Sequence, residues 1–266
     1  MIAWKKIEDG FPVPTRTTEK ITAEKIDTFI DPYTENMVKL LCLSDQSSFI
    51  QVESESAKLW NIDYHRPKPF ILFDHYQNEI TSAGLDPSQP NVFAFADDSG
   101  DVKLFDMGSN TIINSFSTPQ FGDPQYSDLS VTSVKFKPSG TLFATRTFTH
   151  LQVWDTRNNA KPLAVQEVQN YPERGNYVRV GDYSHDSFGS LFLSTDEIYS
   201  GTFGHVFVSW DWKSSVLIKH KASRRSTGMN ESTVDFTKKV SRITVNHGST
   251  ILGVASTASL FFYQLN

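Results

Sequence analysis

The residue types that could carry chemistry are scattered along this chain and do not form a catalytic motif. Its seven histidines show neither the His-x-His nor the His-Glu-x-x-His spacing that places two ligands on one metal ion. The sequence also lacks a Gly-x-Ser-x-Gly turn for an activated serine and a Gly-x-x-x-x-Gly-Lys loop for a phosphate. A triad assembled from distant loops stays open, because triads are defined by geometry. The prediction is a protein that is not an enzyme and uses neither a metal nor a cofactor.

Two groups of charged residues are candidates for binding rather than for catalysis. Glu53 and Glu55, with Asp45 nearby, could offer an acidic patch to a basic substrate; the alternative is that they are solvated loop carboxylates. A basic stretch further along could recruit an acidic or phosphorylated segment, and the alternative there is a solvated flexible loop. Its members are Lys213, Lys219, His220, Lys221, Arg224 and Arg225.

The segment Asp97-Asp98-Ser99-Gly100-Asp101 has the composition of a calcium-binding loop. It lacks the spacing and the closing glutamate of an EF-hand, which supplies the bidentate ligand of that site. Its Asp, Ser and Gly residues are equally those that tight turns require. We therefore predict a hairpin turn between two strands at this place.

Bulk properties exclude several classes of partner. The chain has 266 residues, a net charge of −5 and a pI near 5.8, so a global nucleic-acid footprint is not expected. The single cysteine, Cys42, cannot form an internal disulfide, which suits a reducing compartment: the cytosol, with the nucleus as a further location. Apolar runs such as 40–43 are far too short to span a membrane, and Met1–Lys6 lacks the apolar part of a secretory signal.

The elements that must position any binding site are revealed by repetition. Short apolar strands end in an aromatic residue, often followed by Asp, and these aromatics recur about every 45 to 56 residues. They are Trp60, Phe105, Trp154, Trp210 and Phe262. This is the blade period of WD-repeat proteins, slightly lengthened by loops. Trp4 could occupy the same strand of one more unit.

Further strands recur inside each period. Alternating strands followed by polar turns occupy 80–87, 131–140 and 240–248, and a further strand follows each of them, at 92–96, 142–145 and 251–256. Four short strands per period, joined by Gly, Pro and Asp turns, form a propeller blade. The predicted fold class is therefore an all-β WD-repeat propeller that forms a single domain over 1–266, with about five blades visible in the sequence.

An ordered set of motifs from about Val38 to the end resembles the B-type regulatory subunit of protein phosphatase 2A. The matching stretches include 79–83, 133–136, 145–146, 153–155 and, most specifically, Asp235-Phe236-Thr237-Lys238-Lys239. The resemblance implies a seven-bladed propeller. Ile2–Ile7 resembles the closing strand of the second blade of that family, so the chain is expected to be N-terminally truncated and divergent, and the propeller incomplete.

The same resemblance implies a non-catalytic regulatory subunit that recruits phosphoprotein substrates. Its implied partners are a phosphatase catalytic subunit and a helical-repeat scaffold subunit; neither nucleic acid nor a membrane is expected. A generic WD-repeat scaffold that works without a phosphatase is the alternative. A third possibility from another class is a propeller hydrolase or lyase.

The resemblance also places a substrate groove on one face of the propeller, in loops between the blades. The positions that it carries over are Asp86, Ser133, Thr147, Phe148, Arg179, Asp182, His185 and Ser187. Several of these depart from the chemistry of the family, because Ser133 stands where the family has an acidic residue and Thr147-Phe148-Thr149 where it has Asp-Tyr-Leu. The alternative is that these residues belong to ordinary polar blade turns.

Overall fold

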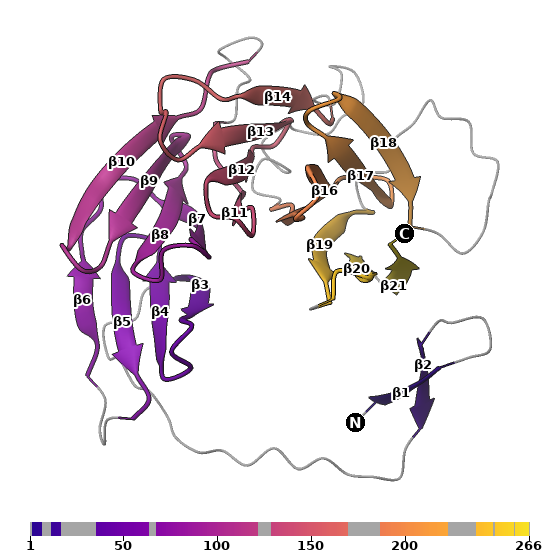
Figure 1. The fold of residues 1–266 in the computed structure, drawn as a ribbon, viewed down its shortest axis with the longest axis horizontal. Coiled ribbons are helices and arrows are strands. Elements are labelled where there is room, and N and C mark those ends of the chain that lie inside the picture. The colour runs from indigo at the N-terminus through magenta and orange to yellow at the C-terminus, as the bar shows by residue number, and fades with distance from the viewer. Residues whose placement is uncertain are drawn as a thin grey trace.

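The structure is a computed structural model that describes residues 2–6, 12–16, 36–63, 68–121, 129–169, 187–222, 238–246, 248–257 and 259–265. For the first two of these segments it describes the backbone alone. Every regular element within the described residues is a β-strand. The predicted all-β propeller is therefore confirmed, and Figure 1 shows its sheets following one another around an arc.

Five antiparallel sheets form the blades, and each uses its strands in chain order. Blade 1 consists of β3 (Met37–Cys42), β4 (Ser48–Glu53), β5 (Ala57–Asn61) and β6 (Phe70–Phe73). Blade 2 consists of β7 (Ile80–Leu85), β8 (Val92–Asp97), β9 (Asp101–Asp106) and β10 (Thr111–Ser117). Blade 3 consists of β11 (Ser133–Phe136), β12 (Leu142–Arg146), β13 (His150–Asp155) and β14 (Ala164–Glu167).

Blade 4 consists of β15 (Ser190–Phe192), β16 (Glu197–Gly201), β17 (Val206–Asp211) and β18 (Val216–Lys221). Blade 5 has three described strands, β19 (Val240–Val245), β20 (Ile251–Ser256) and β21 (Ser259–Gln264). A separate two-stranded sheet pairs β1 (Ile2–Lys6) with β2 (Pro12–Arg16), and Trp4 of β1 lies opposite Pro14. In Figure 1 the first strands β3, β7, β11 and β19 lie toward the inside of the arc, while β10, β14 and β18 lie outside.

The five repeated aromatics occupy equivalent places, as the period predicts. Each lies on the third strand of its blade, near the end of β5, β9, β13, β17 and β21. Each is paired with a residue of the second strand, for example Trp154 with Phe143 and Trp210 with Ile198. The sequence period therefore reports one position in a repeated sheet, because each period supplies the same strand order.

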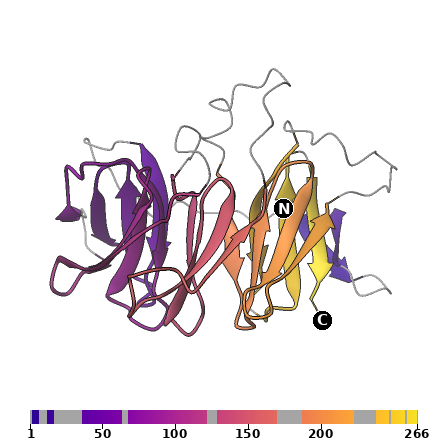
Figure 2. The same ribbon diagram turned by 90° about the horizontal axis from the view of Figure 1, so that it is seen from above.

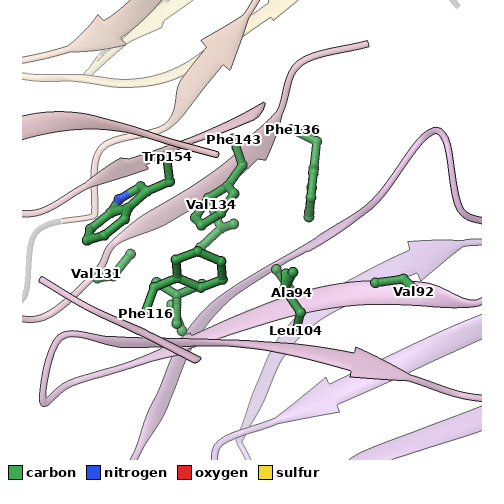
Figure 3. Packing of buried hydrophobic residues seen from close by; sticks show 11 residues of the cluster. Val92, Ala94, Leu104, Phe116, Val131, Val134, Phe136, Phe143 and Trp154 are labelled. Carbon is green, nitrogen blue, oxygen red and sulfur yellow. The ribbon is translucent and has the colours of Figure 1, made fainter. Parts of the chain in front are cut away.

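The core lies between neighbouring blades rather than in the central opening. Phe116 of blade 2 packs edge-on against Phe143 and Trp154 of blade 3, with ring centroids 5.0 and 5.6 Å apart. Val131 and Val134 contribute to the same buried cluster (Figure 3). Burying each large side chain stabilises the fold by about 1.5–3 kcal/mol. β8, the second strand of blade 2, is buried at all six positions because a neighbouring blade covers each of its faces.

Antiparallel order gives the arc two distinct faces, and the blades stand side by side between them in Figure 2. We call one the connection face: it holds the links from one blade to the next and the turns between second and third strands. The opposite face holds the turns between first and second strands and between third and fourth strands. The segment Asp97–Asp101 links β8 to β9 on the connection face, so the predicted hairpin turn is confirmed. Asp97 closes this turn by accepting backbone N–H groups of Ser99 and Asp101.

Candidate interaction site on the connection face

The structure brings four of the eight candidate residues to one face. Ser133 begins β11, Thr147 and Phe148 lie in the turn from β12 to β13, and Ser187 lies in the link that enters β15. All four are therefore at the connection-face ends of blades 3 and 4. Three other candidates lie outside the described residues: Arg179, Asp182 and His185.

Asp86 lies at the opposite face, in the turn from β7 to β8, so the structure does not bring it together with the other four. Its carboxylate is buried and accepts the backbone N–H of Ser88 at 2.8 Å, the Ser88 hydroxyl at 2.7 Å and the amide of Gln89 at 3.2 Å. These contacts are those of an Asx turn, which an Asp side chain makes with the backbone two residues on. Asp86 thus shapes a turn.

Ser133 joins two blades. It is buried, and its Oγ lies 2.8 Å from the Oγ of Ser190 in β15 and accepts the backbone N–H of Ser190 at 3.2 Å. The side chain therefore points into the contact between blades 3 and 4 and is not exposed to solvent. A substitution here acts first on how the two blades pack.

Thr147 and Phe148 are also buried, in a turn whose side chains fold inward. The Thr147 hydroxyl accepts the backbone N–H of His150 at 3.2 Å. Phe148 packs against Phe203, with ring centroids 5.9 Å apart, and Phe203 packs edge-on against Phe188 at 4.9 Å. These three rings form one buried aromatic cluster beneath the connection face. The rings hold the turn from β12 to β13 and the turn from β16 to β17 against the link that enters blade 4.

Ser187 is half-buried and accepts hydrogen bonds from an arginine side chain that the sequence analysis did not single out. Arg242, on the innermost strand β19, donates from Nη1 to the Ser187 hydroxyl at 3.2 Å and to the Ser187 carbonyl at 3.3 Å. Burial of the amine, and to a lesser degree the charge of the exposed Arg242, lowers the pKa of Lys39 on β3. The innermost strands β3 and β19, which are far apart in the sequence, thus place the positive charges of Lys39 and Arg242 close enough to repel each other. No local pattern in the sequence signals this proximity.

Glu53 is a correction, because it is neither part of an exposed acidic patch nor a solvated carboxylate. It ends β4 and has no exposed side-chain surface. Its carboxylate lies 2.8 Å from the Nζ of Lys58 and accepts the Ser56 hydroxyl at 2.9 Å and the amide of Gln51. Gln51 in turn accepts the indole N–H of Trp60 at 2.8 Å. The network satisfies a buried charge, as buried charges require.

The other two residues of the expected acidic patch lie at opposite ends of blade 1. Asp45 is in the turn from β3 to β4 on the opposite face, and Glu55 is in the turn from β4 to β5 on the connection face. Glu55 is exposed, as are Glu79 and Asp98 on the same face of blades 1 and 2. The backbone N–H of Asp98 donates to the carbonyl of Glu79 at 3.0 Å, which places those two residues side by side. An acidic surface therefore exists, with a different membership from the predicted one.

The flexible-loop interpretation of the basic stretch is wrong for its central part. Lys219, His220 and Lys221 lie on β18, the outer strand of blade 4. The His220 ring stacks on Phe207 with centroids 4.8 Å apart, and its Nε2 lies 2.8 Å from the Ser209 hydroxyl. Lys213 pairs with a carboxylate, because its Nζ lies 2.6 Å from Asp196. Arg224 and Arg225 lie outside the described residues.

Arg146 is a second cation that sequence reasoning did not single out. It ends β12, and its side chain is completely buried. Its Cζ lies over the ring of Phe188 at 5.5 Å, and none of its three guanidinium nitrogens has a hydrogen-bond partner within the described part of the chain. Burial lowers the pKa of Arg146 to about 9. A buried arginine is far from ordinary, since arginine is almost never fully buried unless it is paired.

A cavity of about 420 Å³ lies between blades 1 and 2. Phe73, Tyr76 and Phe105 line it together with Lys103 and Asp101, whose Nζ and carboxylate are 2.7 Å apart. The cavity therefore offers an aromatic wall beside a polar rim, in which the Lys103–Asp101 ion pair is already formed and Asp74 adds a further carboxylate. No sequence pattern signals this cavity, because its lining comes from four strands and one link.

Two kinds of site are absent from the described segments. No three His, Cys, Asp or Glu side chains there come together as they would around a metal ion. No helix in these segments is long and apolar enough to cross a bilayer.

Comparisons with known proteins show a distant similarity to regulatory subunits of protein phosphatase 2A. The beta isoform of the B-type 55 kDa regulatory subunit of serine/threonine-protein phosphatase 2A from Carassius auratus is 23% identical over 274 residues, which cover 89% of this chain and 61% of that protein. A 55 kDa regulatory subunit of protein phosphatase PP2A from Drosophila melanogaster is 23% identical over 275 residues, covering 89% and 55%. The chain is distantly similar to these regulatory subunits. It spans about three fifths of their length, and no family model matches it.

Proposed function

We propose that this protein is a non-catalytic regulatory subunit of a protein phosphatase 2A-like serine/threonine phosphatase and that it recruits phosphoprotein substrates. The observation that carries the proposal is the similarity to two 55 kDa regulatory subunits over 89% of the chain. The propeller suits this role, because rigid stacked blades present their loops as one broad surface. The proposed partners are the phosphatase catalytic subunit and a helical-repeat scaffold subunit.

The connection face of blades 1 and 2 is the proposed recruiting surface. The exposed carboxylates of Glu55, Glu79 and Asp98 give it a negative potential, and the 420 Å³ cavity beside Tyr76 offers an aromatic anchor point. Complementary charge steers encounters and selects among partners. The substrates that fit this surface carry Lys or Arg residues near the phosphorylated residue.

Reconstitution tests the assembly. The purified chain is mixed with purified catalytic and scaffold subunits and the mixture is separated by size-exclusion chromatography. We expect one complex that contains all three proteins, and no phosphatase activity from the chain alone, since its motifs supply no nucleophile or metal site. Separate elution of the chain at micromolar concentrations would contradict the proposal and favour the generic WD-repeat scaffold. Activity that stays with the isolated chain, and that one point mutation in it abolishes, would contradict the non-catalytic role.

A pair of double variants tests the recruiting surface. Glu55→Gln with Glu79→Gln removes two charges from the connection face, and Asp45→Asn with Asp63→Asn removes two from the opposite face. In the reconstituted complex, we expect the first pair to raise KM severalfold for a phosphopeptide flanked by lysines, because long-range attraction is reduced. The control pair should leave KM unchanged. Equal effects of the two pairs would show that substrates do not use this face.

A further inference from the structure

A buried polar cluster lies where blades 3 and 4 meet. On blade 3, Ser133 of β11 and Arg146 of β12 are cross-strand partners, so their side chains project to the same side of the sheet. On blade 4, Ser190 of β15 and Ser200 of β16 are paired in the same way. The hydroxyls of Ser133 and Ser190, 2.8 Å apart, join the two sheets. We call these four buried residues the Arg146 cluster.

The cluster holds a positive charge that no described residue neutralises. The Cζ of Arg146 lies 5.5 Å from the centre of the Phe188 ring, and a cation–π contact of this kind supplies no lone pair to the five N–H donors of the guanidinium. None of the three nitrogens has a hydrogen-bond partner among the described residues. With a pKa near 9, Arg146 keeps its charge at neutral pH. The site therefore has donors and a charge, and no acceptor among the described residues bonds to the guanidinium.

The fold handles a buried charge differently elsewhere. Glu53 in blade 1 is equally buried and is matched by the ammonium of Lys58 and the hydroxyl of Ser56. The residues directly across from Arg146 are Ser133 on β11 and Leu151 on β13, and neither can supply a counter-charge. Since an uncompensated charge in a protein interior is strongly unfavourable, a negative group bound at this place would stabilise the folded chain.

We propose that the Arg146 cluster is a binding site for a small oxyanion. The planar guanidinium matches the paired oxygens of a phosphate or carboxylate, and the neighbouring hydroxyls of Ser133 and Ser190 are further donors. The oxyanion arrives either as a free inorganic ion or on an acidic or phosphorylated side chain of a bound segment. The proposal concerns the chain alone and does not depend on its association with a phosphatase.

Thermal unfolding of the full chain tests the site, with sodium chloride replaced by sodium phosphate at constant ionic strength. Ser133→Asp places a carboxylate directly across from Arg146, and Ser139→Asp adds the same charge at an exposed turn of the same blade. We expect phosphate at ten times its Kd to raise the Tm of the wild type and of Ser139→Asp by about 3 to 6 °C more than that of Ser133→Asp. General stabilisation by phosphate acts on all three proteins alike and cancels in this difference.

In chloride alone, Ser133→Asp should already have a higher Tm than the wild type. The same titration with a short phosphoserine peptide and with a glutamate peptide separates the two sources of the oxyanion. A shift with phosphate points to a free ion, and a shift with a peptide alone points to a side chain. No shift with any of these ligands, or equal shifts in all three proteins, would overturn the proposal. If Ser133→Asp does not fold, equilibrium dialysis of the wild type against labelled phosphate and each peptide decides, and absence of saturable binding overturns it.

Discussion

Blades 1 and 3 each bury a charged side chain at the last position of their second strand, and they treat it in opposite ways. In blade 1, Glu53 is surrounded by Lys58, Ser56 and Gln51. In blade 3, Arg146 contacts the ring of Phe188 and has no acceptor within the described part of the chain. The repeated strand order is therefore the same while the electrostatics differ.

The difference shows that a propeller blade can be locally stable or can depend on something outside it. The hydrogen-bond and ion-pair partners of Glu53 come from its own strand, the following turn and the next strand of the same sheet. Blade 1 therefore neutralises this buried charge with its own residues. The side chain of Arg146 faces the neighbouring blade, so a counter-charge for its guanidinium has to come from another blade or from a ligand. Single substitutions of Glu53 and of Arg146 should therefore change the stability of the chain in opposite directions.

The largest effect is expected from Glu53→Leu. The change leaves Lys58 buried without its carboxylate and removes the acceptor of Ser56 and Gln51, so we expect the free energy of unfolding to fall by about 3–5 kcal/mol. Urea denaturation, monitored by tryptophan fluorescence, measures this free energy of unfolding. The exposed neighbour provides the control: Glu55→Leu should change stability by less than about 0.5 kcal/mol. Similar losses for the two variants would show that the buried network contributes little.

Arg146→Met should act in the opposite direction. Removing an unpaired buried charge while keeping an apolar stem should raise the free energy of unfolding by about 1–3 kcal/mol in buffer without phosphate or sulfate. The same urea experiment measures it, with Arg157→Met as the control, because Arg157 is exposed in its pair with Asp155 and such pairs contribute little. A large loss of stability on Arg146→Met would mean that the guanidinium already has a partner in the folded chain.

A smaller effect distinguishes the repeated tryptophans. The indole N–H of Trp154 donates to the Thr145 hydroxyl at 3.1 Å, whereas that of Trp210 has no acceptor among the described residues. Trp154→Phe should therefore cost about 0.5–1.5 kcal/mol more than Trp210→Phe, which is the range of one hydrogen bond. Thermal unfolding of the two single variants measures the difference. Equal losses would show that packing alone sets the contribution of both rings.

The smallest effect is a pH dependence in blade 3. Burial lowers the pKa of His150 below its ordinary value of 6.5; the charge of Glu167 partly opposes this shift, and the charge of Arg146 adds to it. The unfolded chain then takes up the proton first, so stability is complete above about pH 6.5 and declines as the pH falls toward the folded pKa. His150→Gln should reduce this decline, while exposed His75→Gln should not. The free energy of unfolding, measured at several pH values between 7.5 and 5, tests this expectation. If it falls with pH equally steeply in the wild type and in His150→Gln, then His150 is not the source of the decline.

Most of the fold could be predicted because its signals are local. The spacing of Trp60, Phe105, Trp154, Trp210 and Phe262 depends only on repeated strand order, and each lies on a third strand as expected. The turn at 97–101 follows from its residue types alone. The candidate site was less predictable. Charge and polarity in a sequence do not reveal which face a turn occupies or which side chain is buried.

By itself, the sequence determined a repeated, four-stranded, all-β unit and the aromatics that mark it, because strand periodicity and turn chemistry act over a few residues. Only the tertiary structure decided that Glu53 is buried with Lys58, that Asp86 and Ser133 lie at opposite faces, and that Arg146 lies between two blades. Each of these depends on contacts between strands or blades distant in the chain. The physical reason is that burial and pairing are properties of neighbours in space, which a linear pattern does not record.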